Sequence, residues 1–152
     1  MNAVPRGTLA LGSSLALFAC IGCAELHAQS IDEVRRSSIR SVYVVPEVED
    51  RSGIANLLAA DLKARGIDAF VGVDDRRAIA EARPDAVLFY QSRWWWDLTP
   101  YLLSLDAQLR DPTTNTVLAA AQSYRPSLQR VEPKKMVHEV TDAIFGERKR
   151  RD

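Results

Sequence analysis

The stretch that decides the fold is residues 86–124, AVLFYQSRWWWDLTPYLLSLDAQLRDPTTNTVLAAAQSY. Residues 86–96 begin with a near-continuous apolar run, and residues 101–110 alternate apolar with polar side chains, which is typical of strands with one buried face. A turn containing Pro112 precedes residues 116–124, which supply the hairpin partner. The stretch therefore predicts three antiparallel strands in a meander.

Strands and helices alternate on the amino-terminal side of this meander. Residues 39–45 and 67–73 are rich in β-branched and aromatic side chains, which predicts two strands. Residues 53–65 predict a helix that ends at Gly66, because apolar side chains recur there at helical spacing. Residues 75–82 predict a second, shorter helix.

Capping residues mark the helix boundaries. Asp50 and Ser52 are both candidate N-caps for the helix over residues 53–65. After the meander, Pro133 suits the first turn of a last helix that Gly146 closes. The apolar stripe of this last helix consists of Met136, Val137, Val140 and Ile144.

The predicted order of elements is β-α-β-α-β-β-β-α. The alternating first half implies parallel strands with right-handed crossovers, whereas the second half is an antiparallel meander. We therefore expect an α+β (mixed α/β) fold with a five-stranded mixed sheet and helices mainly on one face. The other face of the sheet must then be solvated or covered by a partner.

Composition limits the class of protein. The chain has 152 residues and a formal net charge of zero, and 47% of its residues are hydrophobic. One globular domain fits this length, over residues 29–146, and we expect a basic, disordered tail over residues 147–152. Zero net charge removes the field that non-specific nucleic-acid binding needs, so no nucleic-acid partner is expected.

The first 28 residues have the composition of an export signal. Arg6 precedes an uncharged apolar run over residues 7–24, which is short for a transmembrane anchor. Cleavage before Cys20 or before Cys23 would make the chain a lipoprotein, with that cysteine as the acylated residue. Ordinary signal-peptidase cleavage after Ala28 would make it soluble.

Neither lipoprotein signal is ideal. Leu17-Phe18-Ala19-Cys20 has a bulky residue where a small or β-branched one is usual. Cys20-Ile21-Gly22-Cys23 has a cysteine where leucine is usual. All three cleavage positions therefore stay open. No cysteine follows residue 23, so the folded domain has no disulfide to rely on.

All three tryptophans are consecutive, at positions 94–96. On a strand, Trp94 and Trp96 share one face and Trp95 takes the other. We expect Trp95 to pack beneath the helices, on the face of Val87 and Phe89, while the other two brace the outer face of the sheet.

The alternative is that the outer tryptophans form an exposed aromatic strip for a protein, a glycan or lipid head groups. Charged residues flank the strip and could supply polar contacts. The candidate binding residues are Arg93, Trp94, Trp96, Asp97 and Tyr101.

Motifs that carry catalytic chemistry are missing from the sequence, which contains no phosphate loop, dinucleotide fingerprint or Gly-x-Ser-x-Gly elbow. His138-Glu139 begins like a helical zinc motif, but Asp142 stands where the second histidine belongs. His138 is the only histidine after the export region, and we expect it on a solvated helix face. We therefore expect no metal, no cofactor and no enzymatic activity.

Three stretches carry a resemblance to known proteins. Residues 94–102, the strand end Leu109-Arg110-Asp111 and the helix from Met136 to Ile144-Phe145 resemble a group of small uncharacterised Gram-negative envelope lipoproteins. Their domain is similar to the amino-terminal domain of TolB, the curli-secretion lipoprotein and the lipoprotein activators of penicillin-binding proteins. The resemblance covers about residues 39–146. It implies an envelope location and this fold, and it supplies no catalytic residues.

The expected function is that of a non-catalytic, exported cell-envelope protein, acting as a protein-interaction or assembly module. We expect an outer-membrane lipoprotein on the periplasmic side, because neither Cys20 nor Cys23 is followed by Asp. Its partner would be another envelope protein or a second copy of itself. The alternative is a soluble periplasmic domain that binds a glycan or lipid through the strip at Trp94–Trp96.

Overall fold

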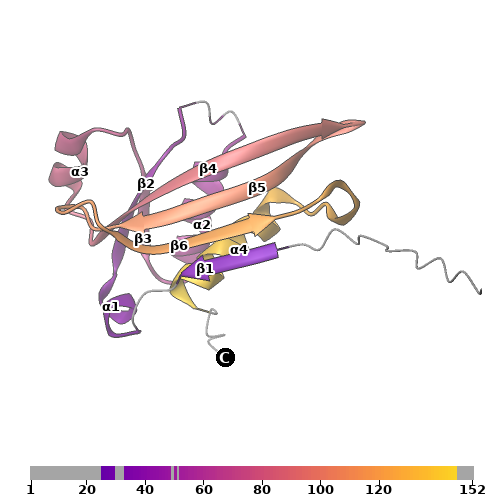
Figure 1. Cartoon of the computed structure of the whole chain (residues 1–152). Coiled ribbons are helices and arrows are strands. Elements are labelled where there is room, and N and C mark those ends of the chain that lie inside the picture. The colour runs from indigo at the N-terminus through magenta and orange to yellow at the C-terminus, as the bar shows by residue number, and fades with distance from the viewer. Residues whose placement is uncertain (1–24, 30–32, 49, 51, 147–152) are drawn as a thin grey trace, which may run out of the picture.

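The computed structural model describes residues 25–29, 33–48, 50 and 52–146 (Figure 1). Residues 1–24 of the predicted export signal, with both cysteines, and the predicted basic tail lie outside the described residues. In chain order the elements are β1 Glu25–Gln29, α1 Glu33–Ser38, β2 Ser41–Val45, α2 Ile54–Ala64, β3 Asp68–Val71, α3 Arg76–Ala82, β4 Ala86–Asp97, β5 Thr99–Arg110, β6 Val117–Tyr124, η1 Ser127–Gln129 and α4 Pro133–Phe145.

The strands form a single mixed sheet of six strands in the order β1-β6-β5-β4-β2-β3. Parallel pairing joins β3 to β2 and β2 to β4, and antiparallel pairing joins β4, β5, β6 and β1. The α+β class and the meander are therefore confirmed. The expected count of five strands is wrong by one, because β1 adds an edge strand.

β1 is a short edge strand that pairs antiparallel with β6, from Glu25 opposite Tyr124 to Gln29 opposite Ala120. Its sequence, ELHAQ, has no β-branched or aromatic residue, so its own composition does not predict a strand. The free edge of β6 supplies its hydrogen-bond partners instead. The short helix α1 was not predicted either.

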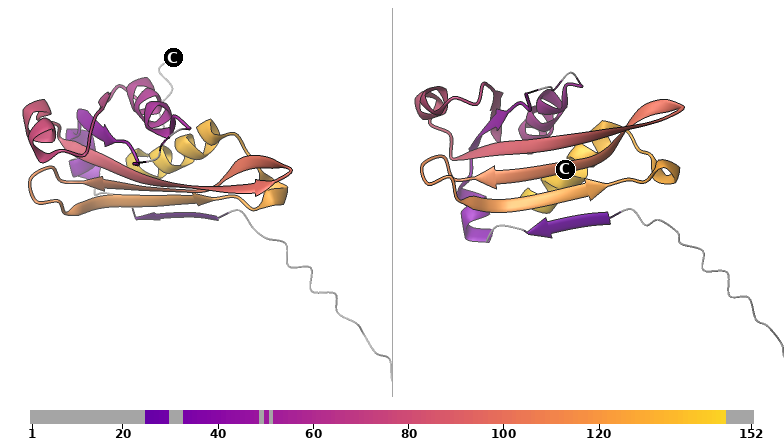
Figure 2. Two further views of the ribbon diagram at one scale, coloured as in Figure 1. Left: turned by 90° about the horizontal axis from the view of Figure 1, so that it is seen from above. Right: turned by 45° about the horizontal axis from the view of Figure 1, so that its top comes forward.

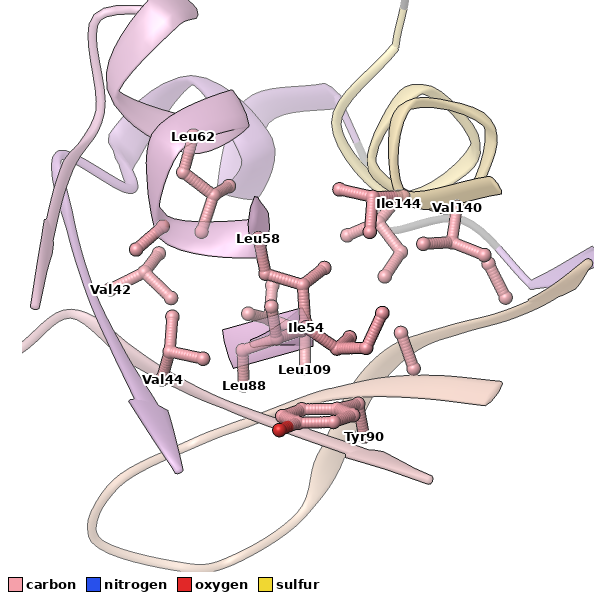
Figure 3. Close-up of a cluster of buried hydrophobic side chains, with 14 of the residues drawn as sticks. Val42, Val44, Ile54, Leu58, Leu62, Leu88, Tyr90, Leu109, Val140 and Ile144 are labelled. Carbon is pink, nitrogen blue, oxygen red and sulfur yellow. The ribbon is translucent and has the colours of Figure 1, made fainter. Parts of the chain in front are cut away.

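Two helices cover one face of the sheet, as expected (Figure 2). The core lies between this face and the helices α2 and α4 (Figure 3). Its fully buried side chains include Val42, Val44, Leu58, Leu62, Leu88, Leu105, Leu109, Val140 and Ile144. The third helix, α3, places Ile79 against Tyr43, Val45 and Val87, a separate and smaller cluster.

The N-cap position of α2 is Gly53, which has a positive φ of 74°, so the prediction that Asp50 or Ser52 is the N-cap residue is wrong. Asp50 nevertheless supplies the acceptor for the first N–H groups of the helix from three residues earlier. Its carboxylate accepts hydrogen bonds from the backbone N–H groups of Gly53 at 2.8 Å and Ala55 at 3.0 Å, and from the Tyr90 hydroxyl at 2.5 Å. Ser52, the other candidate cap, itself donates to Asp50. Asp50 therefore ties the start of α2 to the middle of β4.

No helix within the described residues is long and apolar enough to cross a membrane.

Candidate functional site

The β4–β5 hairpin extends beyond the rest of the sheet. Each of its strands has 12 residues, and they pair as far as Asp97 opposite Thr99. The neighbouring strands are shorter: β6 ends at Tyr124, opposite Ser104, and β2 pairs with β4 only up to Phe89. The far end of the hairpin, where β4 ends and β5 begins, therefore has no other strand beside it (Figure 1).

All three tryptophans lie on this projecting part of the hairpin. Trp94 is 38% exposed, Trp95 60% and Trp96 69%. Leu98, which joins the two strands, is 89% exposed and has a positive φ of 60°. A left-handed backbone is unusual for leucine, and here it closes the hairpin with one residue between the last paired positions.

The expectation that Trp95 packs beneath the helices is wrong. Alternation does place Trp95 on the same face as Val87 and Phe89. That face, however, is the one turned away from α2 and α4. The core-facing residues of β4 are Ala86, Leu88 and Tyr90 instead. Trp95 is also beyond the reach of α3, and it therefore stays in solvent.

A bulge on β5 changes which of its residues lies opposite Trp94. Arg93 pairs with Ser104 and Trp94 with Leu102, so Leu103 is an extra residue on β5. Leu102 is 1% exposed and belongs to the core. Trp94 shares its face and is the least exposed of the three, whereas its two successors lie past the edge of the core.

Arg130 clamps the hairpin from the loop before α4. Its Nη2 contacts the carboxylate of Asp97 at 2.6 Å and donates to the Asp97 carbonyl at 3.0 Å. Its guanidinium carbon lies 4.4 Å from the centroid of the Tyr101 ring, in a cation–π arrangement. The side chain also donates to Thr99 Oγ1 at 3.3 Å.

The five predicted binding residues thus divide into two groups. Arg93, Trp94 and Trp96 are exposed at the hairpin, as a contact surface requires. Asp97 is paired with Arg130, and Tyr101 is only 8% exposed beneath it, so these two shape the hairpin. Nothing in the sequence singles out Arg130, which lies 33 residues from Asp97.

His138 does not lie on a freely solvated helix face. Its Nδ1 is 3.0 Å from Asp61 Oδ1, and Asp61 Oδ2 is 2.7 Å from the Nε of Arg65. The Arg65 side chain is 5% exposed and also reaches Asp142 at 2.6 Å and Thr141 Oγ1 at 2.9 Å. This network fastens α2 to α4.

The pKa values in this network agree with a structural role. Burial alone would raise the pKa of Asp61, but hydrogen bonds from Thr141, Arg65 and His138 outweigh it and lower that pKa. The carboxylate is therefore held ionised as a partner for Arg65, rather than tuned for proton transfer. Among the residues that the structure describes, no group of three or more acidic, histidine or cysteine side chains could hold a metal.

No family model and no curated protein matches this sequence. Among solved structures, the fold of this chain is similar to that of PelC from Paraburkholderia phytofirmans. The PelC L103M dodecamer aligns over 82% of this chain and 100% of its own, with 19% identity and a TM-score of 0.63. A second crystal form of the PelC dodecamer gives a TM-score of 0.62.

Lipoprotein GNA1162 from Neisseria meningitidis is a more distant neighbour. It has a TM-score of 0.38 and 20% identity, over 54% of this chain and 81% of its own. At 19% identity the two PelC alignments establish the fold alone.

Proposed function

We propose that this chain is a non-catalytic, exported cell-envelope protein that assembles with copies of itself. In this proposal, acyl chains on Cys20 or Cys23 tether it to the periplasmic side of the outer membrane. The observation that carries the proposal is the match to PelC, because the whole of that chain aligns with this one and PelC is a dodecamer.

The two edges of the sheet support self-assembly. β1 forms one edge and β3 the other, so they face opposite sides of the molecule. The β3 edge exposes Phe70 at 40%, Val71 at 38% and, just beyond the strand, Val73 at 67%. A contact between unlike edges is head-to-tail, and such contacts close into rings when the rotation between copies allows it.

The position of β1 supports cleavage before one of the cysteines. Cleavage after Ala28 would remove four of the five residues of β1 and leave the edge of β6 unpaired. Cleavage before Cys20 or Cys23 retains the whole strand. Lipoprotein processing is thus the alternative that preserves the sheet, and soluble export is the one that truncates it.

The structural hydrogen bonds and ion pairs of three carboxylates support a non-catalytic role. Within the described residues, the half-buried carboxylates of Asp50 and Asp61 are engaged by the start of α2 and by the Arg65 network. Glu139 is likewise engaged, accepting from Ser123 at 2.7 Å and pairing with Arg125.

One observation favours the second candidate function, a soluble periplasmic domain that binds a glycan or lipid. Trp95 and Trp96 are exposed enough for a sugar ring or a lipid head group to reach them. This function needs no oligomer and no acylated cysteine, which separates it from the first.

Light scattering on the protein extracted from the envelope in mild detergent tests the proposal. We expect a mass of several copies, and we expect Val73→Asp to reduce it because a charge would lie in the edge contact. Val48→Asp is the matched control, since Val48 is fully exposed in the loop between β2 and α2 and belongs to neither edge strand. A single-copy mass for the wild-type protein at every concentration would contradict self-assembly.

A further inference from the structure

Large apolar side chains gather at one end of the molecule. Trp95, Trp96 and Leu98 are exposed on the hairpin, and Leu128 is 97% exposed on η1. Arg130 joins the two segments, because it donates to the Ser127 carbonyl at 3.0 Å and also holds Asp97. We call Trp94, Trp95, Trp96, Leu98 and Leu128 the apolar tip.

The amino-terminal end of β1 lies at the same end of the sheet. Glu25 pairs with Tyr124, Tyr124 with Ser104, and Ser104 with Arg93. Glu25 is therefore level with Arg93, the residue that immediately precedes the apolar tip. Since β1 runs away from the tip, the chain enters β1 from the side on which the tip lies (Figures 1 and 2).

The length of chain before β1 matches the projection of the tip. Asp97 is four residues beyond Arg93, which at about 3.3 Å per residue is roughly 13 Å beyond the level of Glu25. Cys20 is five residues before Glu25 and could reach about 17 Å, whereas Cys23, two residues before, could reach about 7 Å. An acylated Cys20 could thus lie level with the tip. Because Cys23 reaches only about 7 Å, its acylation would place the tip about 6 Å deeper in the membrane than the acylated residue. That depth is roughly the thickness of a head-group layer.

We propose that the apolar tip inserts into the head-group region of the phospholipid membrane that holds the acylated amino terminus. This inference rests on the proposed function, because it takes acylation at Cys20 or Cys23. The chain then contacts the bilayer at two places, and together they orient its strands along the membrane normal.

The chemistry of the tip suits a phospholipid surface. Tryptophan prefers the membrane–water interface, where its ring is apolar and its N–H can still find a partner. The acid nearest the tip, Asp97, is neutralised by Arg130, so it does not repel anionic lipids. Arg93 is exposed at the base of the tip, at the depth where it can meet lipid phosphates.

Intrinsic fluorescence tests this proposal without a label, because the chain has three tryptophans and all of them belong to the tip. The full acylated protein is reconstituted into vesicles of phosphatidylethanolamine and phosphatidylglycerol, with bromine on the acyl chains in one sample. We expect the tryptophan emission to be blue-shifted relative to that of the same protein in the absence of vesicles. We also expect quenching by the brominated lipid and protection from acrylamide.

A single tryptophan at the opposite end of the sheet provides the matched control. Val117 starts β6, away from the tip, and is 44% exposed. In a protein whose three tryptophans are replaced by phenylalanine, Val117→Trp should be quenched by acrylamide and not by brominated lipid. Trp95→Ser with Trp96→Ser should lose most of the lipid quenching, while acylation keeps the protein on the vesicles.

Three results would overturn the proposal. Emission that brominated lipid leaves unquenched, in acylated and vesicle-bound protein, means that the tip does not enter the bilayer. Protection from acrylamide in the absence of vesicles would assign the tip to a contact between copies, leaving the proposed function intact. Mass spectrometry showing no acyl chain would remove the tether, and with it this proposal and the lipoprotein part of the proposed function, while self-assembly would still be decided by light scattering.

Discussion

Replacing Asp50 by alanine tests how the first long helix is held to the sheet. The change removes the acceptor for the backbone N–H groups at the start of α2 and for the Tyr90 hydroxyl. Loss of a side chain that accepts from the first N–H groups of a helix costs about 1–2 kcal/mol, and a hydroxyl left partly buried without a partner adds about 1 kcal/mol. We therefore expect the free energy of unfolding to fall by about 2–3 kcal/mol, a large share of a domain's stability.

The same carboxylate predicts a dependence of stability on pH. Burial would raise the pKa of Asp50, but hydrogen bonds from the Ala55 N–H and from the Tyr90 and Ser52 hydroxyls outweigh it and lower that pKa to about 2. Its value in the unfolded chain is about 3.8. Because the folded pKa is depressed, the stabilisation is present above about pH 4 and is lost as the pH falls towards 2.

The size of this pH effect follows from the shift. A unit of pKa corresponds to about 1.4 kcal/mol, and Asp50 is partly exposed, so solvent screening leaves about 1–2 kcal/mol. Asp50→Asn should lose this contribution and become less sensitive to pH between 4 and 2. Asp74→Asn is the control, because Asp74 is exposed and the neighbouring Asp75 caps α3 instead.

Urea unfolding followed by far-ultraviolet circular dichroism, at several pH values, measures these changes. Tryptophan fluorescence is unsuitable here because all three tryptophans lie outside the core. An Asp50→Ala variant within about 0.5 kcal/mol of the wild type would refute the capping argument, since that is the range of neutral surface substitutions. An Asp50→Asn variant with unchanged pH dependence would refute the assigned pKa.

Three further substitutions have expected outcomes. Arg65→Ala leaves the carboxylates of Asp61 and Asp142 without their buried cation, and it should cost about 3 kcal/mol in thermal or urea unfolding. Arg130→Ala should change global stability by less than about 1 kcal/mol, because its contacts are near the surface. It should nevertheless speed limited proteolysis at the hairpin, and an unchanged cleavage rate would contradict the clamp. Leu88→Ala, at a position with no exposed surface, should cost about 2–5 kcal/mol by urea unfolding.

The meander and the helices were predictable because their periodicity is local. Alternation over residues 101–110 and the apolar stripe ending at Ile144 both appear in the structure where the sequence placed them. The strand β1 was not predictable in this way. Its five residues carry no strand preference of their own, and they pair only because β6 offers a free edge.

The candidate site shows the same division between local and long-range information. Alternation correctly placed Trp95 on the face of Val87, but it does not tell which face of a sheet the helices cover. The clamp between Arg130 and Asp97 and the contact between His138 and Asp61 join residues far apart in the sequence. Such pairs follow from the tertiary fold and leave no periodic signal.

Native mass spectrometry of the protein extracted from the envelope tests the central claim most directly, because one spectrum reports both subunit mass and copy number. We predict subunits that begin at Cys20 or Cys23, carry acyl chains and form a complex of several copies. Unacylated subunits that begin at Gln29 and remain single would contradict it.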